Sequence, residues 1–406
     1  MPLRTRFASL PVQALMMLAG LPSGLQAAAS PVAAPSATLE SLAQQAMSAT
    51  GARGLAIAVI DDGQVAEVGA WGERNAKGEP LTVDTVMYGA SLTKAVVGYH
   101  AMQLVDARRL DLDRPLAEYL PKPLPDYGNV EDRADWSPLA DDPRWRKVTA
   151  RHVLTHSVGF SNFGFLEPDG RLRFHFDPGG RYAYSGDGFI LLQFVLEAGL
   201  GVDFLAATQD GVFTPLGMTR TSLQWRDDFA TNLADGWMID GTVEPHDERS
   251  TPRAAGSMDT TISDMARFAA AYVRGDGLTP ASRIALTTPQ LAVTTRSQFP
   301  SLQPELPREA QRADLAAGLG VIVFEGAQGR AFFKGGHNDS TGNTWVCVEA
   351  TRDCVVILAN DVRAEAAFPA IVASLLGETG APWRWEYGDM VFWRGGRGLR
   401  EESGLP

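Results

Sequence analysis

The chain has 406 residues, 45% of them hydrophobic and 21% charged, which is an ordinary balance for a globular protein with roughly two or three average domains or one large two-lobed domain. The formal net charge of −12 argues against a nucleic-acid partner, because such a partner requires a basic face. An acidic surface does not by itself identify a substrate, since it also keeps a protein in solution.

Residues 1–29 have the layout of a secretory signal peptide. Arg4 and Arg6 form a short basic region, an apolar stretch runs from 7 to about 21, and alanines at 27–29 supply small residues for cleavage. A membrane anchor is the alternative interpretation, but the apolar run is short for a span and is interrupted by prolines. We expect a periplasmic or secreted protein with no integral membrane segment after cleavage.

A Pro- and Ala-rich linker at 30–37 precedes the first regular elements. Apolar periodicity predicts a helix from about 38 to 50, with Gly51 just past its end. Two apolar runs between 54 and 72 flank the turn residues Asp61-Asp62-Gly63 and predict a hairpin.

The middle of the chain is predicted to be mainly helical. Apolar residues recur at helical spacing after Ser91, and Thr261, three residues before Asp264, resembles the start of a capping box for a helix ending near Gly275. The polar, acidic and Pro-containing segment 122–147 predicts an irregular insertion.

The end of the chain returns to strands, predicted at 318–326, 330–336, 343–350 and 354–361, with a closing helix at 364–378. Strands at both ends with helices between them predict an α/β (α+β) fold. We expect an antiparallel sheet built from both chain ends and flanked by helices, with an inserted, mainly helical lobe.

Cys347 and Cys354 lie in two of the predicted strands. A two-residue turn at Ala350-Thr351 would place the two sulfurs opposite each other, where an oxidising compartment would favour a cross-strand disulfide. A pair of buried thiols is the alternative. The spacing, with no histidine in a compatible pattern, is poor metal ligation.

Lysine is rare in this chain, since 31 of its 36 basic residues are arginine; the lysines are Lys77, Lys94, Lys122, Lys147 and Lys334. Only Lys94 has a serine, Ser91, three residues before it, which places both side chains on one helix face. A lysine near a helix N-terminus has a lowered pKa, and a neutral amine can activate a serine nucleophile. A surface Ser and a surface Lys are the alternative.

Two further segments carry possible chemistry. Tyr184 in "RYAYSGDGF" precedes small residues and could present its hydroxyl to a cleft, with a pKa lowered by lysines; an ordinary tyrosine before a turn is the alternative. Lys334-Gly335-Gly336 ends a predicted strand, and glycines there allow a ligand to approach the backbone N–H groups; a Gly-rich hairpin turn is the alternative.

Two other patterns are weak. His152 and His156 have the i, i+4 spacing of a zinc site but lack the Glu of H-E-x-x-H and a third ligand, so we interpret them as structural. Thr at position 93 rules out a G-x-S-x-G nucleophile elbow around Ser91.

The order S-x-x-K, then Tyr, then K-G-G resembles the serine β-lactamase and penicillin-binding-protein superfamily, in particular its class C β-lactamase, D-Ala carboxypeptidase and esterase branch. The phrases "LVDARRLDLDRPLAEYLP", "VTARHVLTHSVGF", "TPLGMTRTSL" and "AAGSMDTTISDMARF" also resemble that branch. The resemblance implies a β-lactamase/transpeptidase-like hydrolase domain at 38–376. Its α/β lobe would comprise about 38–90 and 310–376, its helical lobe about 91–309, and 377–406 would be a C-terminal extension.

The resemblance also implies a role for each matching residue. Ser91 would be the acylated nucleophile, and Lys94 and Tyr184 would activate it and pass the proton to the leaving group. Lys334 would hold a substrate carboxylate and tune Tyr184. The backbone N–H groups of Ser91 and His337, the latter following Gly335 and Gly336, would form the oxyanion hole. No metal and no cofactor are implied.

Two departures from the family pattern leave alternatives open. Many members of the branch begin the third motif with His-x-Gly, so His337-Asn338-Asp339 is a rival register with His337 in the role of Lys334, although Asp339 replaces the usual Gly. Gly186 stands where the family often has the Asn of Tyr-Ser-Asn, a side chain that commonly contacts the amide of a β-lactam or peptide.

The loss of that amide contact favours an esterase-type serine hydrolase acting on small esters. The alternatives are a β-lactamase or D-alanyl-D-alanine carboxypeptidase acting on amides and, in a different class, a catalytically silent penicillin-binding-like protein. Keeping two of five lysines at these positions argues against the silent protein. The sequence does not indicate an oligomeric state.

Overall fold

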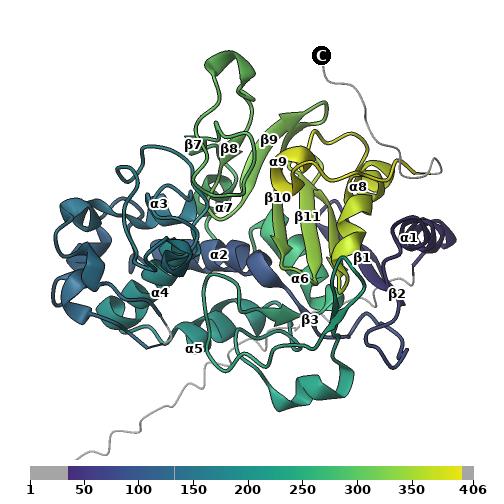
Figure 1. Ribbon diagram of the computed structural model, residues 1–406. Helices are drawn as coiled ribbons and strands as arrows, with labels where there is room; N and C mark the ends of the chain where they lie inside the picture. Colours follow the sequence, from purple (N-terminus) through teal and green to yellow (C-terminus); the bar gives the residue numbers. More distant parts are fainter. Residues whose placement is uncertain (1–34, 132, 396–406) are drawn as a thin grey trace, which may run out of the picture. The chain divides into compact units, whose positions relative to one another are not determined.

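The structure is a computed structural model that describes residues 35–131 and 133–395, and it contains one large antiparallel sheet (Figure 1). The predicted signal peptide at 1–29, most of the linker and the end of the C-terminal extension lie outside the described residues. In spatial order the strands are β2 (Gln64–Gly72), β1 (Gly54–Asp61), β12 (Asp353–Ala359), β11 (Gly342–Val348), β10 (Gly329–His337), β9 (Ile322–Gly326), β8 (Ala316–Ala317) and β7 (Leu291–Ala292).

The two ends of the chain meet in the middle of this sheet. β1 pairs antiparallel with β12, with Ile57 opposite Ile357, so the first strand of the fold lies beside the last. The predicted fold class is therefore confirmed. The edge strand β7 adds a short pairing from within the segment expected to be helical.

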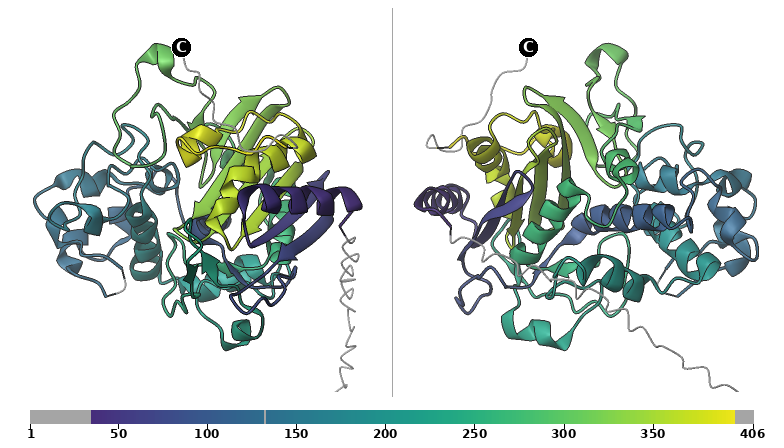
Figure 2. Two further views of the ribbon diagram at one scale, coloured as in Figure 1. Left: turned by 45° about the vertical axis from the view of Figure 1, so that its right-hand side comes forward. Right: turned by 180° about the vertical axis from the view of Figure 1, so that it is seen from behind.

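Helices cover both faces of the sheet, because each strand directs alternate side chains to opposite sides. α1 (Ala37–Thr50) and α8 (Phe368–Leu376) pack on the face that carries Ile57 and Ile357, where Figure 2 shows them side by side. α6 (Ile262–Arg274) packs on the other face, although its residues lie within the range expected for the helical lobe.

The predicted helix caps at Gly51, Thr261 and Gly275 are confirmed, but the Asp264 carboxylate does not complete a capping box, because it accepts from Arg220 N–H and Thr221 instead. α1 ends at Gly51, which has φ 74°, and α6 begins after Thr261, whose hydroxyl accepts the N–H of Asp264 at 3.1 Å. α6 ends at Gly275, with φ 79°. A left-handed φ costs glycine little, so each helix stops at a residue that tolerates the reversal.

Two predicted boundaries are wrong. The strand expected from 318 begins at Ile322, because Gly320, at φ +88°, turns the chain against α2, and a Cβ at Gly320 would lie 2.7 Å from the Lys94 carbonyl oxygen. The helix expected from 364 begins at Phe368, after a 3₁₀ turn η10 (Val362–Ala367); Pro369 lies in its first turn, where a missing N–H costs nothing.

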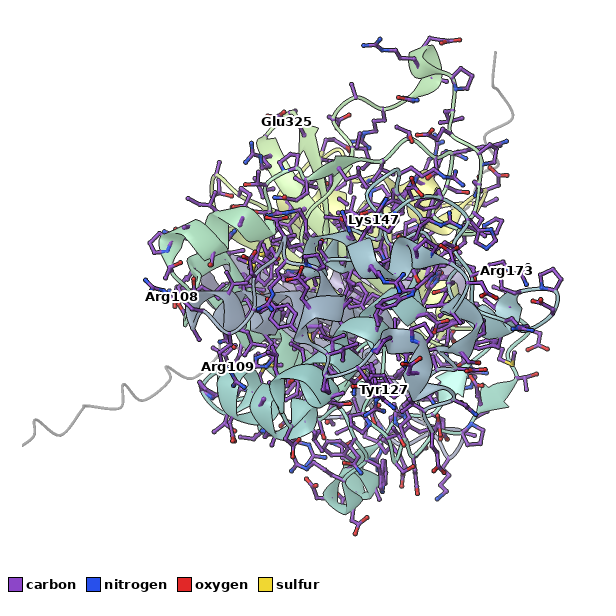
Figure 3. The ribbon with its side chains drawn as sticks, turned by 90° about the vertical axis from the view of Figure 1, so that its left-hand side faces the viewer. Arg108, Arg109, Tyr127, Lys147, Arg173 and Glu325 are labelled. Atoms are coloured by element: carbon purple, nitrogen blue, oxygen red, sulfur yellow. A yellow bond between two sulfur atoms is a disulfide. The ribbon has the colours of Figure 1, made fainter. Side chains whose placement is uncertain are left out.

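The helical part contains α2 (Thr93–Asp106), α3 (Ala150–Leu154), α4 (Gly186–Leu200) and α5 (Phe204–Thr208). The irregular insertion at 122–147 is confirmed: it forms the 3₁₀ turns η3 (Leu124–Tyr127), η4 (Ser137–Leu139) and η5 (Pro143–Lys147). Figure 3 shows the molecule from this side, with Tyr127 and Lys147 labelled.

The other elements are short. They are η1 (Ala90–Leu92), η2 (Leu116–Tyr119), η6 (Gly164–Leu166), η7 (Gln209–Phe213), η8 (Asp227–Asn232), β3 (Met87–Tyr88) paired with β6 (Asp259–Thr260), β4 (Gly236–Trp237) paired with β5 (Val243–Glu244), α7 (Pro280–Leu286), η9 (Arg308–Ala310) and α9 (Trp383–Tyr387).

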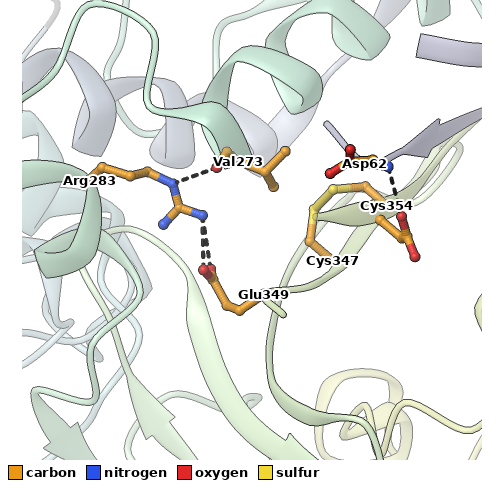
Figure 4. Close-up of a disulfide and its surroundings, with 7 residues drawn as sticks. Asp62, Val273, Arg283, Cys347, Glu349 and Cys354 are labelled. Atoms are coloured by element: carbon orange, nitrogen blue, oxygen red, sulfur yellow. Dashed lines mark hydrogen bonds and ion pairs between the residues drawn. A yellow bond between two sulfur atoms is a disulfide. The ribbon is translucent and has the colours of Figure 1, made fainter. Parts of the chain in front are cut away.

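Cys347 of β11 and Cys354 of β12 lie directly opposite each other and are joined by a disulfide (Figure 4). Their Cα atoms are 4.1 Å apart, and both side chains are buried. The predicted cross-strand disulfide is confirmed, and the alternative of two buried thiols is wrong.

In the part of the chain that the structure describes, no single helix is long and apolar enough to cross a bilayer. Residues Gly186–Leu200 and Phe204–Phe213 meet the length and composition together, but as a pair bent by 106°.

Candidate active site

Ser91 lies in η1, directly before α2. The preceding residue, Ala90, has φ 47°, a left-handed conformation that non-glycine residues seldom adopt. The Thr93 hydroxyl donates to the Ala90 carbonyl at 2.6 Å and holds this turn. Strained turns of this kind are concentrated at functional sites, and this one presents Ser91 to a cavity.

Two of the predicted partners meet at the Ser91 hydroxyl. Lys94 Nζ lies 3.1 Å from Ser91 Oγ, and the Tyr184 hydroxyl donates to the same oxygen at 2.7 Å. Lys94 also donates to the Ala255 carbonyl, and its side chain is only 1% exposed. The structure thus brings together a serine hydroxyl, an amine and a phenol, although Tyr184 follows Ser91 by 93 residues in the sequence.

The pKa of Lys94 is held well below its usual value, chiefly because burial disfavours the charged amine and further because Lys334 is a like charge nearby. The predicted direction is confirmed, but burial, rather than the helix N-terminus, is its main cause. A neutral Lys94 can accept the Ser91 proton across the 3.1 Å contact.

The expectation that lysines lower the pKa of Tyr184 is wrong. Burial raises the pKa of this phenol, and the hydrogen bond with Ser91 offsets the rise only in part. His156 stacks on the Tyr184 ring at 4.2 Å between centroids and accepts the Ser185 N–H through Nδ1. Tyr184 is therefore a neutral, firmly held hydroxyl, which suits it to pass a proton rather than to act as a charged base.

The end of β10 forms the opposite wall. β9 pairs with β10 only as far as Phe333, so the strand edge beyond Phe333 is open. Across the hairpin, the Asn338 N–H donates to the Thr341 carbonyl, so residues 338 and 341 form a hydrogen-bonded pair. Such pairs alternate with non-hydrogen-bonded pairs in an antiparallel ladder, so the next pair, His337 and Gly342, is not hydrogen-bonded. The N–H of His337 therefore points away from β11, toward the open edge. A Cβ at Gly336 would lie 3.1 Å from the Ser91 nitrogen, which shows how closely the strand passes the serine.

Lys334 and His337 both line the cavity but differ in their partners. Lys334 Nζ donates to the Gly335 carbonyl at 2.6 Å and lies 5.5 Å from the Tyr184 ring centroid. Burial lowers the pKa of Lys334 to about 8, and the negative charge of Glu386 opposes this effect. The His337 ring instead pairs with Glu365, with 3.1 Å between Nδ1 and Oε1.

The cavity around Ser91 has a volume of about 820 Å³, ample for a small organic substrate. Apart from the residues above, its lining includes Tyr88, Asn162, Phe163, Asp247, Glu248, Arg249, Arg253, Gln298, Phe299, Asp339 and Glu386. Both polar and aromatic side chains therefore meet a substrate.

Gly186 does not line the cavity but lies behind Phe163, which does. Its N–H donates to Asn162 Oδ1 at 3.0 Å, and a Cβ at position 186 would lie 2.3 Å from Phe163 Cε1. Phe163 thus occupies the space that a side chain at 186 would need. Asp187 does not replace the missing amide, because its carboxylate accepts the Gly164 N–H at 2.6 Å and anchors the 162–166 loop.

Sequence reasoning missed Phe163 and, above all, Glu386 of the C-terminal extension. Glu386 is 4% exposed and accepts a hydrogen bond from Gln298 at 2.7 Å. The Trp-rich phrase "APWRWEYGDMVFWRGG" contains Glu386, and the sequence alone leaves open whether that phrase borders the cleft or covers an apolar surface.

The weak histidine pair does not form a common site. His152 accepts the Thr149 N–H at the start of α3, whereas His156 packs on Tyr184. Among residues 35–395, with 132 left aside, no three His, Cys, Asp or Glu side chains are grouped so that they could hold a metal ion.

Comparison with known proteins shows the family to which the chain belongs. The family model described as Beta-lactamase matches residues 39–376, and the chain belongs to that family. It is 31% identical to a lovastatin esterase of Penicillium rubens over 193 residues, 41% of this chain and 48% of that protein. It is 26% identical to penicillin-binding protein 4 of Amycolatopsis lactamdurans over 246 residues, 56% of this chain and 61% of that protein.

The match therefore spans only about half to three fifths of these two curated relatives. Among solved structures, a class C β-lactamase superposes with a TM-score of 0.65 at 18% identity, covering 84% of this chain and 95% of that one. At that identity the likeness shows the fold alone, and the recognised β-lactamase/transpeptidase fold is confirmed. Families with this fold are usually serine hydrolases.

Proposed function

We propose that this protein is a serine hydrolase that cleaves small esters through an acyl-enzyme on Ser91. The observation that carries the proposal is the convergence of Lys94 and Tyr184 on the Ser91 hydroxyl, at 3.1 and 2.7 Å, inside a cavity of about 820 Å³. A silent binding protein on the same fold would not require an amine buried to 1% exposure beside a serine, because that burial is costly.

Acylation begins when Ser91 Oγ attacks the ester carbonyl carbon. A C–O bond forms, the serine proton passes to neutral Lys94, and the carbonyl electrons move onto oxygen. The N–H groups of Ser91 and His337 stabilise this oxyanion, because the open edge of β10 faces the serine turn.

Collapse of this intermediate breaks the bond to the alkoxy group and leaves the acyl group on Ser91. The alkoxide receives a proton through the Tyr184 hydroxyl, which is replenished from Lys94. Water then attacks the acyl carbon and gives one proton to Lys94 and Tyr184. The bond from the acyl carbon to Ser91 Oγ breaks, Ser91 takes that proton back, and the acid is released.

Phe163 favours esters over amides. An amide has a poor nitrogen leaving group and must be aligned and protonated, which a side-chain amide at position 186 would assist. Phe163 fills that place with an aromatic ring, and the Gly186 N–H is already bound by Asn162. Hydrolysis of β-lactams or of D-alanyl-D-alanine peptides is the alternative, supported by the likeness to penicillin-binding protein 4.

A substrate panel on purified protein tests this proposal. We expect short-chain aryl esters to have a kcat/KM at least ~10²-fold higher than a chromogenic cephalosporin, a D-alanyl-D-alanine peptide or benzylpenicillin. Turnover of the cephalosporin as efficient as that of the esters would refute the ester assignment.

We also propose that the chain is exported to the periplasm or secreted, with 1–29 removed. The basic and apolar layout of the N-terminus supports this proposal, as does the Cys347–Cys354 disulfide, since such bonds persist in oxidising compartments. N-terminal sequencing of protein from cell fractions is the test; an intact N-terminus in the cytoplasmic fraction would refute export.

A further inference from the structure

The C-terminal extension places a carboxylate inside the proposed active site. In α9, Trp385 Nε1 donates to Thr295 at 3.2 Å, and the Trp385 carbonyl accepts the Gln298 N–H at 2.8 Å, so the helix is held on the 295–298 segment. The next residue, Glu386, accepts from Gln298 Nε2 at 2.7 Å. Gln298 in turn accepts the Tyr182 hydroxyl at 2.8 Å, which fixes the orientation of its amide.

The Glu386 carboxylate lies against the backbone of the K-G-G motif. A Cβ at Gly335 would lie 2.0 Å from Glu386 Oε1, so any side chain at position 335 would displace the carboxylate. Glu386 and Lys334 are each 4% exposed, and both line the cavity with Ser91. The absence of a side chain at Gly335 thus leaves the space that the Glu386 carboxylate occupies.

This arrangement changes what Lys334 can do for a substrate. A lysine that anchors a substrate carboxylate needs an unbalanced positive charge, but Glu386 lines the same cavity and lies close enough for its negative charge to act on Lys334. The other nearby carboxylate, Glu365, is paired with His337. A second anion at Lys334 would approach Glu386 in a poorly solvated space, where like charges repel strongly.

The other charged side chains that line the cavity do not offset the repulsion between Glu386 and a substrate carboxylate. The basic side chains along the described part of the cavity are Lys94, Lys334, His337, Arg249 and Arg253, and the acidic ones are Asp247, Glu248, Asp339 and Glu386. Burial disfavours the charged form of Lys94, as does its like-charged neighbour Lys334. With Lys94 neutral and the charge of His337 balanced by Glu365, the four remaining acidic groups outnumber the three remaining basic ones.

We propose that Glu386 is a specificity-determining residue that excludes substrates carrying a carboxylate next to the scissile bond on the leaving-group side, so that the natural substrate is an ester with a neutral alcohol portion. This inference rests on the proposed ester hydrolysis at Ser91. It replaces the expectation that Lys334 holds a substrate carboxylate, and Lys334 is instead left to orient Tyr184.

The test compares two esters of nearly equal size and leaving ability, 3-carbamoylphenyl butyrate and 3-carboxyphenyl butyrate, at pH 7. The wild-type kcat/KM should be ~10- to 100-fold higher for the neutral ester, the scale of one close like-charge contact in partly solvated surroundings. Glu386→Gln keeps the acceptor for Gln298 but removes the charge, and should reduce the ratio to within about threefold of one. Glu386→Asp keeps the charge and should preserve the preference.

Glu378→Gln is the matched control, because it removes one exposed carboxylate from the same extension, and it should leave the ratio as in wild type. A wild-type ratio near one, a preference for the anionic ester, or an unchanged ratio in folded Glu386→Gln would each overturn the inference. If Glu386→Gln does not fold, the wild-type ratio decides. Failure to hydrolyse either ester would instead refute the proposed function.

Discussion

Phe163 and position 186 compete for the same space, and this competition can be measured. A Cβ at position 186 would lie 2.3 Å from Phe163 Cε1 and 2.4 Å from its Cζ, more than 1 Å inside an ordinary van der Waals contact. Gly186→Ala must therefore displace the ring. The ring also stacks on Phe165, with 5.1 Å between centroids, so moving it breaks a second contact.

The cost of Gly186→Ala follows from this geometry. Overpacking of this kind costs about 1–3 kcal/mol, and replacing a helical glycine by alanine returns about 0.5–1 kcal/mol. We expect a net loss of about 1–2 kcal/mol in the free energy of unfolding. With Phe163→Ala the obstacle is gone, so the same change at 186 should be neutral or stabilising, a coupling of about 1–3 kcal/mol between the two sites.

Urea denaturation of the wild type, both single variants and the double variant gives this coupling directly. The same logic extends to substrate choice: Phe163→Ala with Gly186→Asn should raise the cephalosporin-to-ester ratio of kcat/KM by ~10-fold, the value of about one added hydrogen bond, whereas Gly186→Asn alone should not. Strictly additive stabilities, or an equal gain from Gly186→Asn alone, would refute the proposed steric competition.

Other outcomes follow from the same site. Lys94→Arg keeps a charge but loses the titratable base, so ester hydrolysis should fall by ~10²-fold or more, and near-normal rates would refute its role. Lys334→Ala should reduce activity more than His337→Ala, because Lys334 lies over Tyr184; the reverse order would establish the His337 register. In wild type, kcat/KM should fall as the pH drops through the depressed pKa of Lys94, because the protonated amine cannot act as a base. In Lys334→Met this fall should occur at higher pH, because a like charge that lowers the pKa of Lys94 is lost. A pH–rate profile that is the same in both proteins would contradict the effect of Lys334 on Lys94. Non-reducing peptide mapping should show Cys347 joined to Cys354, and replacing both by alanine should lower the free energy of unfolding by ~2 kcal/mol, as expected for a short closed loop; free thiols in exported protein would contradict the bond.

Local patterns were sufficient to predict the strands of the described sheet except the two-residue strands β8 and β7. The hairpin at 54–72 and the strands after 318 appear in the sequence as apolar runs between turn residues, and the caps at Gly51 and Thr261 depend on neighbouring residues alone. The serine and its lysine were predictable for the same reason, since both lie within one helical turn.

Features that depend on tertiary packing were not predictable. The pKa of Tyr184 rises because distant segments bury it, and no local pattern reports that burial. Phe163 reaches position 186 through the fold of the 162–166 loop, and Glu386 reaches Gly335 of the K-G-G motif only because α9 docks beside the end of β10. Neither contact leaves a trace in residue spacing.

The central claim is that Ser91 is the nucleophile. Its most direct test is to treat wild type and Ser91→Ala with a fluorophosphonate and to map the adduct by peptide mass spectrometry. We expect one adduct, on the peptide that contains Ser91, with loss of ester hydrolysis in proportion to labelling, and neither labelling nor turnover in folded Ser91→Ala. Labelling that persists in Ser91→Ala, with the adduct on another serine, would contradict the account.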